Sequence, residues 1–165
     1  MTIKEYVEKY VSQGLTTAQA RSITAQQIIL SKITKSKYVD KVLLKGGVVM
    51  YNITQEQRRS TLDLDIDLIR INIQNDENIE QFLNDLNNKD QNYHIKLDGP
   101  IEELHHQDYK GKRINILISD ESENIHFKMD IGVHTLLAIT QNKMCFSLGL
   151  HLIITYLCSG YLSIK

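Results

Sequence analysis

Hydrophobic residues recur at two different spacings along this chain, and each spacing predicts a different kind of element. Three- and four-residue spacing predicts helices over residues 3–11, from Thr16 or Thr17 to about Ile33, and over residues 77–89. Strict alternation of apolar and polar residues predicts strands over residues 62–68, 93–97, 114–118 and 125–131. A short apolar run over residues 41–45 predicts a buried strand, and a further helix is expected from Val48 to about Gln55.

The most informative stretch is residues 59–69, Arg-Ser-Thr-Leu-Asp-Leu-Asp-Ile-Asp-Leu-Ile. Its alternation places the carboxylates of Asp63, Asp65 and Asp67 on one face of a single strand. Neighbours on that face lie roughly 6.5–7 Å apart. Asp63 and Asp65 can therefore hold metal ions about 3.5–4 Å apart, as in two-metal phosphoryl-transfer sites. The alternative is the solvated outer face of an edge strand, where charge prevents aggregation.

Two other features have the chemistry to extend such a site. Gly46 and Gly47 follow a predicted strand and precede a predicted helix, an arrangement that lets a phosphate approach the backbone and free N–H groups. A tight turn explains the two glycines equally well. Asp130 lies on the polar face of the strand over 125–131 and is the best candidate for a third carboxylate. Ordinary solvation of that strand is its alternative explanation.

The composition is that of one globular domain, with 165 residues, 42% hydrophobic and 24% charged. A net charge of −1 excludes a polyelectrolyte binder, yet the charge is unevenly distributed. Residues 1–59 carry +6 and residues 60–165 carry −7. A basic front half beside an acidic strand suits a polyanion held near a metal site, although solvated helical lysines would look the same.

The remaining composition bears on location and on the end of the chain. Two cysteines fit neither a disulfide framework nor a zinc spacing, and the start lacks the apolar core of a signal peptide, so a cytoplasmic protein is expected. No histidine is assigned a metal role.

Residues 145–164 contain no Asp, Glu, Lys or Arg, and the run predicts a buried terminal helix in preference to a membrane segment. A chain end never selected for folding is the other possibility.

The order Leu44-Lys45-Gly46-Gly47, a helix, then Arg59-Ser60-Thr61-Leu62-Asp63-Leu64-Asp65-Ile66 resembles a known family. This family is the abortive-infection nucleotidyltransferase toxins of type IV toxin–antitoxin systems, which belong to the DNA polymerase β-like nucleotidyltransferase superfamily. The resemblance covers roughly residues 1–132. It implies an α/β (α+β) nucleotidyltransferase core, with a mixed, mostly antiparallel sheet flanked by helices.

The resemblance also implies roles for individual residues. The implied nucleotide-binding residues are Lys45, Gly46, Gly47, Arg59 and Thr61. The implied catalytic residues, which would also bind two Mg²⁺ (or Mn²⁺) ions, are Asp63, Asp65 and Asp130. Asp67 lies roughly 13 Å along the strand from Asp63, too far to share the metal pair, and is expected to support it indirectly or to be solvated.

The implied reaction moves a nucleoside monophosphate from an NTP to a hydroxyl of an RNA, such as the 3′ end of tRNA, or of a protein. A cognate antitoxin is the implied protein partner, and no membrane partner is expected. Nothing after Asp130 matches the family's helical C-terminal region, which suggests a truncated or frame-shifted member whose transfer activity is impaired. The expected parts are N-terminal helices over 1–35, a core over 36–132 and an apolar tail over 133–165. The alternative function is a non-catalytic remnant that binds nucleotide or an antitoxin.

Overall fold

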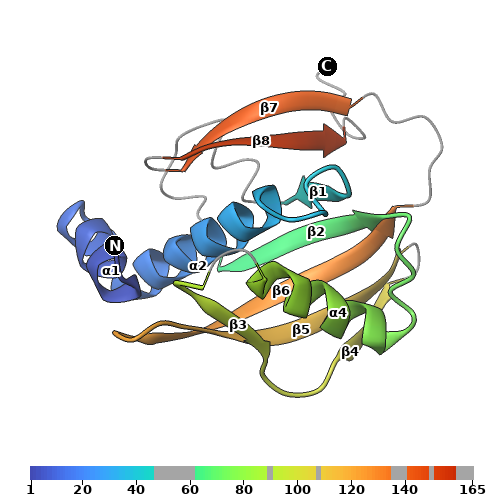
Figure 1. The fold of residues 1–165 in the computed structure, drawn as a ribbon, viewed down its shortest axis with the longest axis horizontal. Helices are drawn as coiled ribbons and strands as arrows, with labels where there is room; N and C mark the ends of the chain where they lie inside the picture. The colour runs from blue at the N-terminus through green and yellow to red at the C-terminus, as the bar shows by residue number, and fades with distance from the viewer. Residues whose placement is uncertain (47–61, 89–90, 107–108, 135–140, 149–150, 159–165) are drawn as a thin grey trace.

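The computed structural model describes residues 1–46, 62–88, 91–106, 109–134, 141–148 and 151–158 (Figure 1). Its helices in this part of the chain are α1 (Ile3–Ser12), α2 (Thr17–Thr34) and α4 (Asp76–Asn87). The first strands are β1 (Val42–Lys45), β2 (Asp63–Ile69), β3 (His94–Leu97) and β4 (Glu102–His106). The later strands are β5 (Tyr109–Ser119), β6 (Asn124–His134), β7 (Gln141–Leu148) and β8 (His151–Cys158).

The strands form one sheet in the order β3-β5-β6-β2-β1-β8-β7, with β4 also paired to β5. The β2–β6 and β1–β8 pairs are parallel, and the other pairs are antiparallel. The predicted fold class, a mixed and mostly antiparallel sheet with helices, is therefore confirmed. Strand β2 lies between β1 and β6, so the edge-strand explanation of its aspartates is wrong.

Local sequence signals define the ends of the helices. Thr2 caps α1 and Thr16 caps α2, each in a capping box with the Glu or Gln three residues later. Asn75 caps α4 by accepting from the backbone N–H of Glu77. These polar residues satisfy backbone N–H groups that have no partner inside the helix, and so define where each helix begins.

The hydrophobic core covers one face of the sheet. The buried side chains of β2 are Leu64, Ile66 and Leu68, which alternate with the aspartates. They pack in one cluster with apolar residues of β5, β6, α2 and α4. Figure 1 shows α2 and α4 running across the sheet. Because side chains alternate between faces, the acidic residues of β2 occupy the face opposite this core.

The end of the chain differs from its prediction. The expected terminal helix over 145–164 is wrong, because residues 141–148 and 151–158 form two antiparallel strands. Strand β8 pairs in parallel with β1, opposite Leu43 and Leu44. An apolar run does not distinguish a buried strand from a buried helix by periodicity. The open edge of β1 offers backbone hydrogen bonds to an extended segment.

Two other differences concern the middle of the chain. Strand β4 was not predicted, because its sequence Glu-Glu-Leu-His-His lacks alternation and is polar. The helix expected from Val48 lies outside the described residues.

None of the helices within the described ranges has both the length and the apolarity needed to cross a bilayer.

Candidate functional site

Four strands bring charged residues together in one row across the face of the sheet opposite the core. In this row Lys45 of β1, Asp65 of β2, Asp130 of β6 and Arg113 of β5 are successive partners. Asp65 and Asp130 are directly opposite one another in a parallel pair, although 65 residues separate them in the sequence. The register therefore places the two predicted carboxylates side by side.

The neighbouring row adds the third carboxylate and another cation. Asp63 is the register partner of Lys128, and their Oδ2 and Nζ atoms lie 3.1 Å apart. Arg113 donates to both oxygens of Asp130, from Nε and from a terminal nitrogen, at 2.8 Å each. This two-point contact fixes the plane of the Asp130 carboxylate. It also raises the pKa of the Arg113 guanidinium, first through these hydrogen bonds and then through the charge of Asp130.

Asp65 is a partly buried carboxylate that lies close to two other negative charges. Burial raises the pKa of Asp65, and the negative charges of Asp130 and Asp63 raise it further. Lys45 and Arg113 act in the opposite direction but do not cancel the effect. Among the described residues, no cation forms an ion pair with Asp65. A cation bound between the carboxylates would relieve this repulsion.

Gly46 packs directly against Asp65. Its φ is +66°, and a Cβ at this position would overlap Oδ2 of Asp65. Only glycine therefore allows the turn after β1 to approach this carboxylate so closely. The other predicted nucleotide-binding residues of this region, Gly47, Arg59 and Thr61, lie outside the described residues.

Lys45 of this row pairs with the buried carboxylate of Asp67. Asp67 is only 4% exposed and accepts a hydrogen bond from Nζ of Lys45 at 3.0 Å. The solvated alternative for Asp67 is therefore wrong. Lys45 extends from its own row toward Asp67, so its ammonium neutralises a buried acid in this structure. Its predicted role in nucleotide binding stays a prediction.

We call Asp63, Asp65 and Asp130 together the carboxylate site. Their oxygen donors suit a hard divalent cation. Carboxylate oxygens are the preferred ligands of Mg²⁺ and Mn²⁺. In the described part of the chain, however, no three Asp, Glu, His or Cys side chains converge as ready metal ligands. Two of the three carboxylates instead face Lys128 and Arg113. The residue types fit a metal, while the side-chain orientations are those of an ion-paired state.

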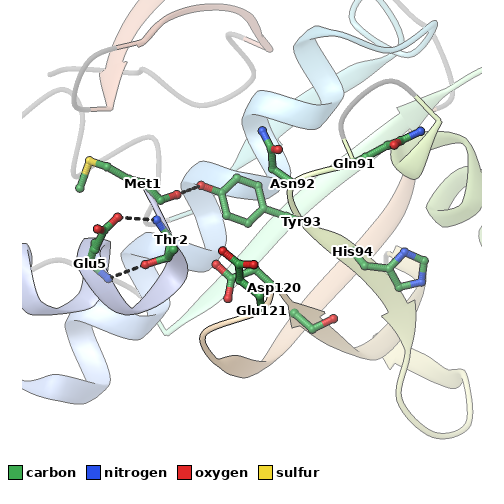
Figure 2. A pocket seen from close by; sticks show the side chains of 10 residues that line it. Met1, Thr2, Glu5, Gln91, Asn92, Tyr93, His94, Asp120 and Glu121 are labelled. Carbon is green, nitrogen blue, oxygen red and sulfur yellow. Dashed lines mark hydrogen bonds between the residues drawn. The ribbon is translucent and has the colours of Figure 1, made fainter.

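A separate pocket of about 660 Å³ lies elsewhere, between the start of α1, the start of β3 and the β5–β6 turn (Figure 2). Its polar groups already serve the fold: Glu5 accepts from the Thr2 N–H, and Asp120 accepts from the Ile3 N–H. Its Ser119 lies six residues along β5 from Arg113, roughly 20 Å away. This pocket is therefore distinct from the carboxylate site.

Sequence reasoning did not identify Arg113 or Lys128 as members of the site. Lys128 precedes Asp130 by two residues on the same strand face, a spacing that could have singled it out. Arg113 had no such signal, because its proximity to Asp130 depends on the β5–β6 register. Arg113 was therefore hidden from the sequence, because ion pairs between strands leave no mark in the local sequence.

Comparison with known proteins agrees with this geometry. The family model described as nucleotidyl transferase AbiEii toxin, type IV TA system, matches residues 28–147. This match spans most of the chain, including the row of Lys45, Asp65, Asp130 and Arg113, and the protein therefore belongs to that family. No curated protein matches the chain. Its general role is that of a nucleotidyl transfer toxin, and nucleotidyltransferases generally use a divalent metal ion.

Proposed function

We propose that this chain transfers a nucleoside monophosphate from an NTP to a hydroxyl of an RNA, such as the 3′ end of tRNA, or of a protein. The observation that carries the proposal is the register of Asp65 with Asp130, beside Asp63, in a chain of this family. The hydroxyl oxygen attacks the α-phosphorus, the bond to the β-phosphate oxygen breaks, and pyrophosphate leaves. The hydroxyl proton passes to a carboxylate of the site.

Asp130 is the residue best placed to accept that proton. Arg113 holds both of its oxygens, yet each carboxylate oxygen retains a second lone pair. The two hydrogen bonds from Arg113 therefore orient the Asp130 carboxylate without preventing it from accepting a proton. Asp63 and Asp65 would hold Mg²⁺ or Mn²⁺, which supplies charge neutralisation for the triphosphate. Gly46 keeps the turn after β1 against Asp65, so a nucleotide bound along that turn would lie next to the carboxylates.

The decisive experiment incubates the purified chain with each of the four radiolabelled NTPs, Mg²⁺, and either total tRNA or total protein. We expect label on one acceptor class with the wild type and at least a hundredfold less with Asp65→Asn, since charge stabilisation supplies much of such catalysis. Asp40→Asn is the matched control, because Asp40 is an exposed carboxylate outside the site.

The outcomes separate two functions. Equal labelling by wild type and Asp65→Asn would contradict catalysis by the carboxylate site. Binding of an NTP to the wild type without transfer to either acceptor would favour the alternative, a chain that binds nucleotide or an antitoxin without catalysis. Labelling of tRNA but not protein, or the reverse, would identify the acceptor.

A further inference from the structure

Lys128 and Arg113 pair with the carboxylate site in different ways. Arg113 makes two hydrogen bonds of 2.8 Å to Asp130, whose side chain is 17% exposed. Lys128 makes a single 3.1 Å contact to Oδ2 of Asp63, and both side chains are more than a third exposed. A guanidinium fork is a rigid, permanent partner, whereas an ammonium on a flexible chain is a point charge that can move away. Lys128 is thus the displaceable cation of the two.

The charge of the site sets how many divalent ions it can accept. Asp63, Asp65 and Asp130 contribute three negative charges, and Lys128 and Arg113 contribute two positive ones, so the group carries −1. One divalent ion would reverse this sign, and a second would add to an already positive site. A triphosphate brings several negative charges and removes that penalty. The ion pair at Asp63 therefore disfavours metal in the absence of nucleotide.

We propose that Lys128 is a built-in competitor for the metal at Asp63, which makes divalent-ion binding depend on nucleotide. Without nucleotide, its ammonium occupies the carboxylate oxygen that a metal ion would use. When a triphosphate arrives, the ammonium can leave Asp63 for a phosphate oxygen, and the carboxylate becomes available to the ion. Lys128 acts in this way as a positioning residue, and the inference rests on the proposed function of the site.

The test measures free Mn²⁺ by electron paramagnetic resonance during titration of the full chain, with and without a non-hydrolysable NTP analogue. We expect Lys128→Met to bind Mn²⁺ alone at least about tenfold more tightly than the wild type, the effect of one charge about 4 Å from a divalent ion in a partly solvated site. We also expect the analogue to tighten Mn²⁺ binding by a smaller factor in this variant than in the wild type.

Lys96→Met is the matched control. It removes the same charge from an exposed residue of β3, which the sheet order separates from β2 by two strands. Its Mn²⁺ affinity should equal that of the wild type within about twofold, because screening weakens distant exposed charges. Lys128→Gln serves as a second variant, and urea unfolding checks that each variant folds. Raising the salt concentration should reduce the difference between wild type and Lys128→Met.

Mn²⁺ binding to Lys128→Met that is equal to or weaker than that of the wild type would overturn the inference. So would the absence of Mn²⁺ binding in every variant. Failure of the inference is separable from failure of the proposed function. If the wild type transfers label and Asp65→Asn does not, while Lys128→Met leaves Mn²⁺ affinity unchanged, only the role of Lys128 is wrong. If Lys128→Met tightens Mn²⁺ but no variant transfers label, the metal site stands and the transfer reaction is wrong.

Discussion

Asp65 combines two features that a surface aspartate would not have. It is half-buried beside two other carboxylates, and the turn at Gly46 presses against one of its oxygens. Burial and like charge raise the pKa of Asp65, which means that the folded protein disfavours its ionised form. Folding thus keeps a group that costs stability when the site is without a cation. Raised carboxylate pKa values of this kind occur often at functional sites.

The first residue-scale prediction concerns the close approach of Gly46. Gly46→Ala should destabilise the protein by more than the about 1–2 kcal/mol expected for alanine at positive φ, because the new Cβ also meets Asp65. Gly14→Ala is the matched control, since Gly14 has a φ of +96° but nothing within 4 Å of an added Cβ. Urea unfolding measures both changes, and Mn²⁺ titration with nucleotide should show weaker binding for Gly46→Ala alone. Identical behaviour of the two variants would mean that the Asp65 contact imposes no constraint.

At the scale of elements, Asp85 ties α4 to the segment between α2 and β1. The hydroxyl of Tyr38 donates to Asp85 Oδ2 at 2.7 Å, and the Lys37 ammonium lies 2.7 Å from the same oxygen. Gln81 donates to the other oxygen at 2.9 Å. Tyr38 also packs edge-on against Phe82, with ring centroids 4.9 Å apart. The Asp85 carboxylate thereby supplies the polar contacts between α4 and this segment, next to the apolar contact of Tyr38 with Phe82.

This arrangement predicts how stability depends on pH. Burial alone would raise the pKa of Asp85, but hydrogen bonds from Lys37, Tyr38 and Gln81 outweigh it and lower the pKa. A lowered pKa means that the folded state favours the carboxylate, so its stabilisation is present above the unfolded value of 3.8 and is lost as pH falls through the folded value. Asp85→Asn should flatten the loss of stability between neutral pH and about pH 3.

Urea unfolding at a series of pH values measures that dependence. Asp40→Asn is the control, because this exposed carboxylate has no hydrogen bond or ion pair with the described residues. It should leave the slope of stability against pH unchanged. If wild type and Asp85→Asn have the same slope of stability against pH, the contacts of Asp85 with Lys37 and Tyr38 contribute nothing to the loss of stability in acid.

At the scale of the whole molecule, the β7–β8 hairpin extends the sheet beyond β1. Figure 1 shows the two strands beside the rest of the sheet, next to β1. Strand β1 carries Lys45 and leads into Gly46, so whatever stabilises β1 also stabilises one side of the carboxylate site. Covering the edge of β1 protects its backbone groups from water and from pairing with other chains.

A chain that ends at Val133 tests this coupling. Without β8, the backbone amides of residues 42–45 should exchange with solvent roughly tenfold faster, because local opening of an edge strand costs less free energy. Hydrogen exchange followed by mass spectrometry measures the effect, and residues 114–118 in β5 serve as the internal control. Unchanged exchange of β1 would mean that the hairpin does not stabilise the strand that borders the site.

The sequence by itself determined the helices α1, α2 and α4, the strands β1, β2, β3, β5 and β6, and the face that each alternating residue occupies. The alternation of residues 62–69 requires Asp63 and Asp65 to share a face, because successive side chains of a strand point in opposite directions. Three- and four-residue spacing of apolar residues located the helices, because one face of each must be buried. These are local properties, which a stretch of about ten residues contains in full.

Only the tertiary structure decided which residues meet. Asp130 lies beside Asp65, and Arg113 beside Asp130, because of strand order and register between segments far apart in the chain. The pairs of Lys45 with Asp67 and of Lys128 with Asp63 arise in the same way. The apolar end became two strands because an open sheet edge was available to pair with it. Register and edge availability are properties of the assembled sheet, so no single segment contains them.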